Sequence, residues 1–467
     1  MRMTNPKKNM AQNNFSTSSS NTIVVIGAGP AGSVCASVLA KYGTYKIILI
    51  EKSKHPRHHV GESLQPAIMD ILAKHLGSDV CQKIAKQSYA YKFGAQYIWG
   101  ESRKPWRILF DERLEQNIQN MTEQELWDGD FEHAWQVSRS SFDAILFEAT
   151  KNFGVQTYQN TAVTNIEREH ESITKIHLSN GEILEPDFVV DATGQTCLLG
   201  RNMGWYQTVE DLKSVAVYGY FEGAGGVEGI LGRHVQLVVT VPEGWIWFIP
   251  ISETMTSIGL VTKSKNLTTK YTEDDFLHIL KNAPIPLENG QLVSVEGQSR
   301  ILYARDWSYQ CKRFVGENFL LVGDAACFVD PILSGGVDFA IRSAANAALA
   351  ILQKLDVNQH QALFDYQEQL KREYHAYLRM ARYWYESNRS VDGFFWQAYD
   401  SIDSQLPNKK LTSTPLRAFV YLTSGRYAAD QHFRIFTQWQ EKLMFSALGV
   451  NKHTKEQIRS KLSQQEK

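Results

Sequence analysis

One stretch near the N-terminus, residues 22–51, constrains the fold of this chain more than any other. Residues 22–27 (TIVVIG) are β-branched or apolar on both faces, which is typical of a strand buried in a parallel sheet. A helix is predicted from Pro30 to about Tyr42, where Gly43 ends it, and the KIILIEK segment forms a second buried strand. A strand, a glycine-rich turn, a helix and a strand make a βαβ unit, so an α/β fold is predicted.

The turn of this unit reads GAGPAG, with glycines at positions 27, 29 and 32. Gly27 permits a tight turn, Gly29 lets a phosphate approach the backbone, and Gly32 allows the helix and strand to pack closely. The helix N-terminus attracts phosphate charge, and Glu51, 19 residues after Gly32, stands where a ribose hydroxyl would bind. An incidental glycine-rich loop is the alternative, but the strand–turn–helix context favours a dinucleotide site.

Length and composition limit the number of domains, the kinds of partner and the location that can be expected. The 467 residues are enough for two or three domains, and a net charge of −1 predicts neither nucleic acid nor a membrane as a partner. Five cysteines without a CxxC pair favour a reducing, cytoplasmic location over a disulfide framework or a zinc site. Residues 1–20 lack an apolar core and are predicted to be a disordered tail rather than a signal peptide. The apolar run 22–40 contains the patterned glycines, so a nucleotide-binding turn explains it better than a membrane span.

The rest of the chain predicts a mixed architecture. Residues 137–154 predict a helix, and residues 155–194 are mostly strand up to FVVDATG. Several strands with glycine turns between residues 213 and 262 predict an antiparallel sheet. Beyond about residue 337 the chain is predicted to be helical, with a break near 403–415.

The strand GWIWFIP, residues 244–250, concentrates aromatic surface in that sheet. At a period of two, Trp245, Trp247 and Ile249 share one face and the other face is also apolar, so burial on both sides is expected. Two interpretations stay open on these residues alone, a large core strand or a wall beside a cofactor.

Several motifs together resemble those of the flavin-dependent halogenases, in the branch that acts on phenols, pyrroles and carrier-tethered substrates rather than on free tryptophan. The resemblance runs from about residue 22 to beyond 420. It rests on GAGPAG, PRHHVGESLQPAIMDILAKHLG (56–77), KFGAQYIWG (92–100), DATGQTCLLGRNMG (191–204), GWIWFIP, GDAACFVDPILSGGVDFAI (323–341), YWYESNRSVDGFFWQAYDSI (383–402) and RAFVYLTSGR (417–426).

The resemblance implies an FAD-binding, Rossmann-like fold of the flavoprotein monooxygenase (GR2) type, with an antiparallel β-sheet substrate domain and a helical C-terminal region. The FAD-binding domain is expected to be discontinuous, from 21–210 with 300–350. The substrate domain is expected at 211–299 and the helical region at 351–467.

The resemblance also implies which residues contact FAD. Asp324, in the late GDA element, is expected near the ribityl or phosphate region, and Arg139 is expected to reach the cofactor, although a surface helix residue is the alternative. The complete implied set is Gly27, Gly29, Ala31, Gly32, Glu51, Arg139, Asp324 and Pro331.

Lys92 is the predicted catalytic residue. No Asp or Glu lies between Asp79 and Glu101, so a buried lysine here would lack a local counter-charge and its pKa would fall by desolvation. A surface lysine is the alternative from position alone. The resemblance implies that its amine holds, or reacts with, hypohalous acid.

The segment Ser334, Gly335 and Gly336 precedes a predicted helix, whose N-terminal amides favour an anion. By resemblance, halide (chloride or bromide) binds there beside the flavin. Gly335 stands where related enzymes often have a second serine, and Asp338 where a histidine is common.

No metal site is predicted. The cluster of His55, His58 and His59 lacks acids or cysteines at ligand spacing and is expected to be a loop of solvated imidazoles. Asp274 and Asp275 follow Thr272 and are expected to be charges in the first turn of a helix, not a catalytic pair.

The resemblance implies a complete reaction. Reduced FAD (FADH2), delivered by a separate NAD(P)H-dependent flavin reductase, reacts with O2 to a flavin hydroperoxide, halide gives hypohalous acid, and Lys92 directs chlorination or bromination of an electron-rich ring. The substrate is a phenol or pyrrole, free or held on an acyl or peptidyl carrier protein, in natural-product biosynthesis. Trp245 and Trp247 would form the wall between flavin and substrate.

Three rival interpretations remain. The nearest is a flavin-dependent aromatic hydroxylase, which would need no halide. The others are a reductase of isoprenoid double bonds and a non-catalytic protein that carries FAD or lipid on the same fold.

Overall fold

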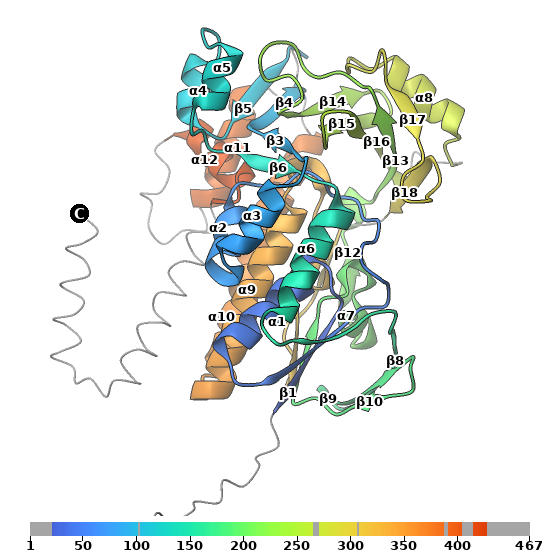
Figure 1. The fold of residues 1–467 in the computed structure, drawn as a ribbon, viewed down its shortest axis with the longest axis vertical. Coiled ribbons are helices and arrows are strands. Elements are labelled where there is room, and N and C mark those ends of the chain that lie inside the picture. Colours follow the sequence, from blue (N-terminus) through green and yellow to red (C-terminus); the bar gives the residue numbers. More distant parts are fainter. Residues whose placement is uncertain are drawn as a thin grey trace, which may run out of the picture.

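The computed structural model describes residues 21–100, 103–264, 270–305, 308–386, 391–403 and 414–426. Its first layer is a five-stranded parallel sheet in the order β20-β11-β1-β2-β7 (Figure 1). The strands are β1 (Thr22–Ile26), β2 (Lys46–Ile50), β7 (Gln156–Tyr158), β11 (Phe188–Asp191) and β20 (Phe319–Leu321). In register, Ile23 pairs with both Phe188 and Ile47. The predicted βαβ unit and parallel sheet are confirmed.

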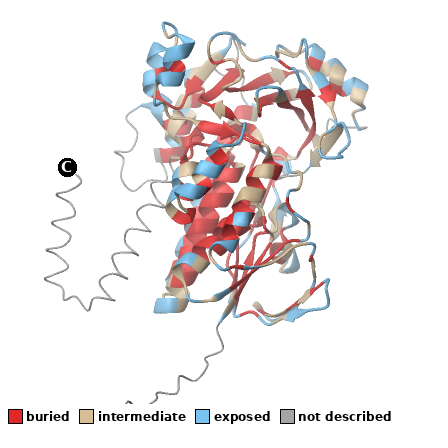
Figure 2. Cartoon of the chain, viewed as in Figure 1, coloured by how far each residue is buried: buried red, intermediate tan, exposed pale blue. Residues whose placement is uncertain are grey.

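Helix α1 packs against strands β1 and β2 of this sheet and lies at the centre of a group of helices. It contacts α9, α6 and α2, and its residues from Pro30 to Leu39 are all buried, because small side chains let the neighbouring backbones approach closely (Figure 2). These helices are α1 (Pro30–Tyr42), α2 (Ala67–Leu76), α3 (Ser78–Ala85), α6 (Arg139–Lys151) and α9 (Gly336–Val357).

The second large sheet has eight strands in the order β17-β13-β16-β15-β14-β4-β5, with β18 also paired to β13. All its pairs are antiparallel except β4 with β14. The strands are β4 (Gly94–Ile98), β5 (Trp106–Leu109), β13 (Ser214–Glu222), β14 (Gln236–Val241), β15 (Gly244–Pro250), β16 (Met255–Lys263), β17 (Gln291–Val293) and β18 (Ile301–Arg305). The sheet therefore takes in two strands from the first quarter of the chain.

Strand β15 is buried on both faces, as its sequence predicts. Trp245, Trp247 and Ile249 lie in the main core, whereas Ile246 and Phe248 lie in a second core. Helix α8 (Glu273–Lys281) packs Phe276 and Leu280 into this second core.

The chain continues as helices α10 (Gln361–Glu386), α11 (Val391–Asp403) and α12 (Pro415–Thr423). Their aromatic side chains pack against β4 and β5: the Trp384 and Phe394 rings are 4.2 Å apart, and Tyr97 stacks on Trp384 at 5.1 Å. This packing brings the end of α12 to strand β4, more than three hundred residues away in sequence.

Shorter elements complete the described fold. Strands β3 (Ala90–Lys92) and β6 (Ala134–Gln136) pair with each other. The remaining elements are α4 (Glu112–Asn117), α5 (Glu123–Asp128), β8 (Val163–Glu169), β9 (Ser172–Leu178), β10 (Ile183–Leu184), η1 (Gly194–Thr196), α7 (Leu198–Asn202), β12 (Tyr206–Thr208), η2 (Glu210–Leu212), β19 (Tyr309–Cys311), η4 (Gly323–Ala325), β21 (Cys327–Phe328) and η5 (Pro331–Leu333).

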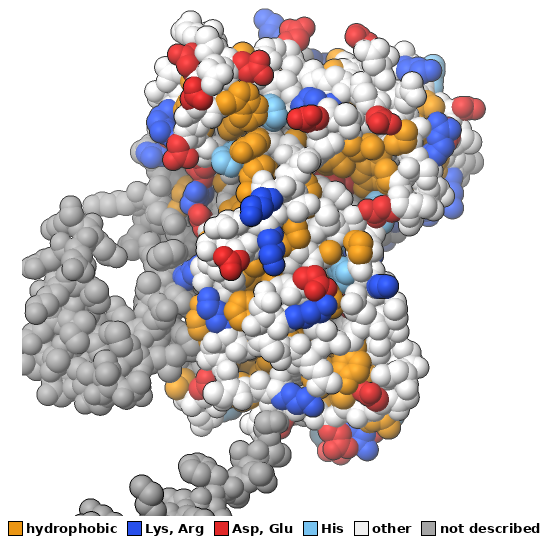
Figure 3. Space-filling model, viewed as in Figure 1, with side chains coloured by type: hydrophobic (Ala, Val, Ile, Leu, Met, Phe, Trp, Pro, Cys, Tyr) orange, Lys and Arg blue, Asp and Glu red, His pale blue; other side chains and the backbone are white. Residues whose placement is uncertain are grey.

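Two sequence-based expectations fall on residues that the structure does not describe. The tail at 1–20 lies outside the described residues, as does most of the predicted break near 403–415. Within the described residues, no helix combines the length and the apolar character needed to cross a membrane. Charges of both signs are interspersed over the face shown in Figure 3, in keeping with the net charge of −1.

Candidate functional site

The glycine-rich turn after β1 has the backbone of a phosphate cradle. Gly27 has φ +100°, and a Cβ on Gly32 would overlap the Gly27 carbonyl oxygen, so both positions require glycine. A Cβ on Gly29 would meet only the Arg57 guanidinium among the described residues, at 3.6 Å, so the space above this backbone is open. A phosphate at this turn would therefore meet the N-terminus of α1 and a nearby cation.

Glu51 ends β2 beside this turn and is buried. One carboxylate oxygen accepts a 2.9 Å hydrogen bond from the Ala28 amide, and the other accepts one of 3.0 Å from the Ser53 amide. The Arg57 Nε lies 3.6 Å from the same carboxylate. Sequence reasoning missed Arg57, because nothing local distinguishes it from an exposed loop arginine.

Arg139 and Asp324 come from segments far apart in the sequence and lie close enough for their charges to interact. Arg139 is buried at the start of α6, where it pairs with Asp143 at 2.8 Å and donates to the Val60 carbonyl at 2.8 Å. Burial raises the pKa of Asp324 to about 7, and Arg139 partly offsets this rise. Within the described part of the chain, the Asp324 carboxylate accepts no hydrogen bond, so it is available to a ligand hydroxyl.

The GDA element also packs directly onto the glycine-rich turn. A Cβ on Gly323 would lie 3.4 Å from the Ala31 Cβ and 3.1 Å from the Ala340 backbone. Helices α1 and α9 therefore hold Asp324 beside the phosphate cradle. The cradle, the open face of Gly29 and the unpartnered Asp324 together fit a dinucleotide cofactor such as FAD.

The predicted halide segment lies at the start of α9. Ser334 is left-handed (φ 54°), its amide donates to the Pro331 carbonyl at 2.9 Å, and its hydroxyl donates to Gln236 Oε1 at 2.7 Å. The amides of Gly335 and Gly336 donate to no acceptor in the described part of the chain, as expected for the first residues of a helix. These amides can bind an anion.

Asp338, three residues into this segment's helix, is fully buried and pairs with Arg342 at 2.6 Å. Arg342 also contacts Glu373, so one guanidinium faces two buried carboxylates. Burial raises the pKa of both Asp338 and Glu373, and Arg342 opposes that rise. The negative charge next to the halide segment is therefore balanced by an arginine on the same helix.

Lys92 ends β3 and is only 2% exposed. Its Nζ donates a 3.0 Å hydrogen bond to the Leu64 carbonyl and lies 5.4 Å from the centre of the Phe110 ring. No carboxylate among the described residues forms an ion pair with it, and desolvation lowers its pKa to about 7. The alternative of a surface lysine does not hold in this structure.

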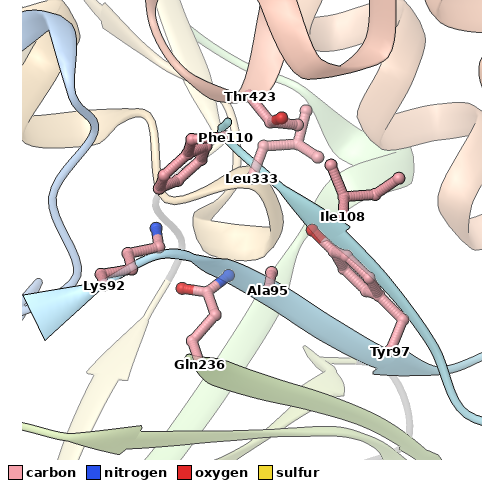
Figure 4. A pocket seen from close by; sticks show the side chains of 8 residues that line it. All are labelled: Lys92, Ala95, Tyr97, Ile108, Phe110, Gln236, Leu333 and Thr423. Atoms are coloured by element: carbon pink, nitrogen blue, oxygen red, sulfur yellow. The ribbon is translucent and has the colours of Figure 1, made fainter. Parts of the chain in front are cut away.

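Lys92 faces a small, partly enclosed cavity whose volume of about 10 Å³ has room for about one water molecule (Figure 4). Apolar side chains make most of its wall, and the hydroxyl of Tyr97 and the amide of Gln236 also reach it. The lining residues are Lys92, Ala95, Tyr97, Ile108, Phe110, Gln236, Leu333 and Thr423. Leu333 precedes Ser334, so the lysine cavity and the halide segment adjoin.

The two tryptophans of β15 are buried, but neither lines this cavity. Trp247 Nε1 donates to the Ser257 hydroxyl at 3.2 Å, and Trp245 Nε1 donates to Tyr385 Oη at 2.8 Å. Tyr385 in turn donates to Asp330, the residue before Pro331. Trp245 is thus linked to the loop that leads into the halide segment, whereas Trp247 is bound to β16.

A run of rings connects Trp245 to the cavity. Trp99 lies 6.4 Å from Trp245 and 5.1 Å from Trp384, and Trp384 lies 5.1 Å from the cavity residue Tyr97. Aromatic side chains therefore fill the space between β15 and the Lys92 cavity.

The histidine loop differs in part from expectation. His55 is buried, stacks on Phe147 at 4.9 Å, and its Nε2 lies 3.0 Å from the Ala28 carbonyl oxygen, so it supports the glycine-rich turn rather than facing solvent. The acids that follow Thr272 are confirmed as helix-start charges, because Thr272 and Asp275 form a capping box at α8.

Comparisons with known proteins agree on one family. The tryptophan halogenase family model matches residues 22–129 and 115–457. The 1H-pyrrole-2-carbonyl-[peptidyl-carrier protein] chlorinase of Pseudomonas fluorescens is 33% identical over 354 residues, covering 72% of this chain and 76% of that protein. A flavin-dependent halogenase of Armillaria mellea is 31% identical over 361 residues, covering 70% and 64%. The solved myxobacterial chondrochloren halogenase, described as a variant of FAD-dependent halogenases, has a TM-score of 0.71 at 28% identity, covering 91% of this chain and 97% of that chain.

Proposed function

Because the chain belongs to the tryptophan halogenase family and is a flavin-dependent halogenase, we propose that Lys92 carries oxidised halogen to an electron-rich aromatic ring. The observation that supports this role is a buried amine with no counter-charge at the wall of a mostly apolar cavity. A cation is costly in such a place, so the amine is held in or near its neutral, nucleophilic form at neutral pH.

The proposed cofactor contacts rest on the glycine-rich turn and on Asp324. The turn from Gly27 to Gly32 and the N-terminus of α1 would hold the FAD phosphates, and Asp324 would accept a hydrogen bond from a cofactor hydroxyl. Bound reduced FAD supplies, with O2, the oxidising equivalents that convert halide to hypohalous acid. A separate flavin reductase would provide the reduced cofactor.

The start of α9 would bind the halide. The amides of Gly335 and Gly336, which have no acceptor among the described residues, would face the anion at the helix N-terminus, and Gln236 holds the Ser334 hydroxyl nearby. Hypohalous acid formed at this segment would lie close to Lys92, because Leu333, the residue before Ser334, lines the lysine cavity.

Halogen transfer at Lys92 can follow either of two routes, and in both the atoms and electrons balance. In the first, the neutral amine bonds to the halogen as the O–X bond breaks, and water leaves; the N–X bond then breaks as the C–X bond forms, and the ring proton returns to nitrogen. In the second, the ammonium form donates a hydrogen bond to the oxygen of hypohalous acid, which leaves as water when the ring takes the halogen. The dependence of rate on pH separates the two routes.

The substrate is proposed to be a phenol or a pyrrole, because electrophilic halogenation needs an electron-rich ring. The cavity beside Lys92 has room for a small oxidant only, so the ring would approach the apolar side chains of Phe110, Ile108 and Leu333 from outside it. A relative named as a chlorinase of a pyrrole held on a carrier protein supports a carrier-bound pyrrole as one candidate. Trp245 and Trp247 are proposed to separate this cavity from the flavin.

The test is incubation with FAD, a flavin reductase, NADH and either bromide or chloride. A panel of phenols and pyrroles, free and carrier-bound, is offered as acceptor, and mass spectrometry detects the halogen isotope pattern. A halogenated acceptor that requires halide and disappears in Lys92→Met supports the proposal. Oxygenated product formed without halide would identify a hydroxylase instead.

A further inference from the structure

Gln236 connects the halide segment to the lysine cavity. Its side-chain oxygen accepts a 2.7 Å hydrogen bond from the Ser334 hydroxyl and one of 2.6 Å from the Ser63 hydroxyl. The same side chain lines the cavity beside Lys92 (Figure 4). The three hydrogen-bonding side chains come from separate parts of the sequence and meet at one amide.

The backbone fixes where this amide lies. Gln236 begins β14 and pairs in parallel with Ala95 of β4, while the Phe93 amide donates to the His234 carbonyl at 2.8 Å. These pairings place Gln236 beside Ala95, three residues after Lys92. Because Gln236 is only 4% exposed, its side chain cannot turn out to solvent.

The Gln236 side-chain amide uses only its oxygen in hydrogen bonds within the described part of the chain. Two hydroxyls occupy Oε1, whereas Nε2 donates to no group in the described part of the chain and faces the cavity. A buried amide N–H without an acceptor is unfavourable, and an apolar side chain of similar size would avoid that cost. An acceptor oxygen in the cavity would satisfy this N–H.

We propose that Gln236 is a positioning residue for halogen transfer: its Oε1 holds the Ser334 hydroxyl at the halide segment, and its Nε2–H binds the oxygen of hypohalous acid at Lys92. This inference rests on the proposed function of the site. With the oxygen held by Gln236, the halogen faces the amine; as the N–X bond forms and the O–X bond breaks, the oxygen takes the amine proton and leaves as water. Gln236 is unchanged by the step.

Two substitutions test the two ends of the amide. Gln236→Met keeps the volume and removes both the acceptor and the donor. Gln236→Glu keeps the acceptor for the hydroxyls but places a carboxylate beside the amine. Gln96→Met is the matched control, because Gln96 is a buried glutamine on β4 that lies outside the lining of the cavity.

Chloride affinity of the FAD-loaded protein, measured without turnover by chloride-35 NMR, reports on the halide end. Gln236→Met is expected to weaken it severalfold, because the bond from the Ser334 hydroxyl to Gln236 Oε1 fixes the backbone whose amides would face the anion. Ser334→Ala should have the same effect, and the double variant should be no weaker than either single one. During turnover, the share of hypohalous acid captured by an added trap, monochlorodimedone, should rise severalfold in Gln236→Met at the expense of the aromatic product.

The proposal requires both changes in Gln236→Met at unaltered FAD loading, so either change alone, or neither, overturns it. In Gln236→Glu, the Lys92 pKa followed by NMR of 13C-labelled lysine should rise by about one unit or more. An unchanged pKa would refute the placement of the amide beside Lys92. If the wild type forms no halogenated product, the proposed function fails, while chloride affinity and the Lys92 pKa still decide the role of Gln236.

Discussion

The Nζ of Lys92 donates a 3.0 Å hydrogen bond to the carbonyl oxygen of Leu64. This bond turns the amine toward the cavity wall without supplying a negative charge, so the amine is oriented and its pKa nevertheless stays low. A carboxylate in the place of the carbonyl would have kept the lysine charged. The pairing of a lysine with a backbone carbonyl therefore gives a positioned amine that can lose its proton near neutral pH.

Replacing Lys92 by Met should abolish halogenated product while FAD binding persists, because the cofactor residues lie on other elements. Product and trapped hypohalite are measured together. Lys41→Met is the matched control, since Lys41 also donates to backbone carbonyls, at Lys74 and His75, far from the cavity. Normal product from the Lys92 variant would contradict the proposed role.

The same substitution should change how stability depends on pH. In the folded state the Lys92 pKa is about 7, against 10.5 for a free lysine, so the cost of the buried cation is fully present below pH 7. Between pH 7 and 10.5 the unfolded chain binds the extra proton, and the wild type gains about 1.4 kcal/mol of unfolding free energy per pH unit relative to Lys92→Met. Denaturant titrations of both proteins at pH 6 and pH 9 measure this difference, and a constant difference would show that Lys92 is not buried as described.

Rate against pH separates the two routes at Lys92. If the neutral amine bonds to the halogen, the halogenation rate rises as pH increases through about 7 and then levels off; if the ammonium form is needed, the rate falls over the same range. We expect the rise. Lys92→Arg should then be inactive at every pH, because a guanidinium does not lose its proton. An active arginine variant would favour the hydrogen-bonding route.

Opening the β15 wall should uncouple halogen formation from halogen transfer. Trp247 packs against Gly259 and is anchored to Ser257, so Trp247→Ala removes much of the partition and costs about 3–5 kcal/mol of stability. The less disruptive Trp247→Phe should show the same direction with a smaller loss. Both should give less halogenated product per NADH and more trapped hypohalite or hydroxylated product. The control is Trp127→Ala, at an exposed tryptophan; unchanged product ratios in both Trp247 variants would remove the wall from the mechanism.

Arg342, which lies on the helix that follows the halide segment, should make a large contribution to the free energy of unfolding. Arg342→Met leaves Asp338 and Glu373 buried without their cation, which should cost about 3–5 kcal/mol at pH 8. The unpaired carboxyls then have folded-state pKa values above those of the unfolded chain, so the deficit should shrink as pH falls toward 5 and they become protonated. Arg382→Met, which breaks the exposed pair with Asp211, should cost no more than about 1 kcal/mol at either pH. A deficit that does not change with pH would argue against this account.

Short sequence patterns predict much of the architecture. Gly27 has a positive φ and Gly32 lies against the Gly27 carbonyl, so both are required within the turn itself, although Gly27 also lies against the distant Ala192 carbonyl. The capping box from Thr272 to Asp275 begins α8 as the spacing predicts. The burial of β15 on both faces follows from the apolar side chains on both of its faces. These features depend on neighbours in sequence, which is why the sequence predicts them.

The chemistry of the site depends on contacts that no local pattern contains. Lys92 is predicted as a candidate, but its burial is decided by Phe110, Leu333 and Thr423, which come from β5's end, the loop before α9 and the end of α12. Gln236 carries no motif, and only the pairing of β14 with β4 places it between Lys92 and Ser334. Sequence therefore determined which elements form, because that is set by short-range backbone and side-chain preferences. Only the tertiary structure decided which side chains share one cavity, because that depends on how two sheets and a distant helix pack together.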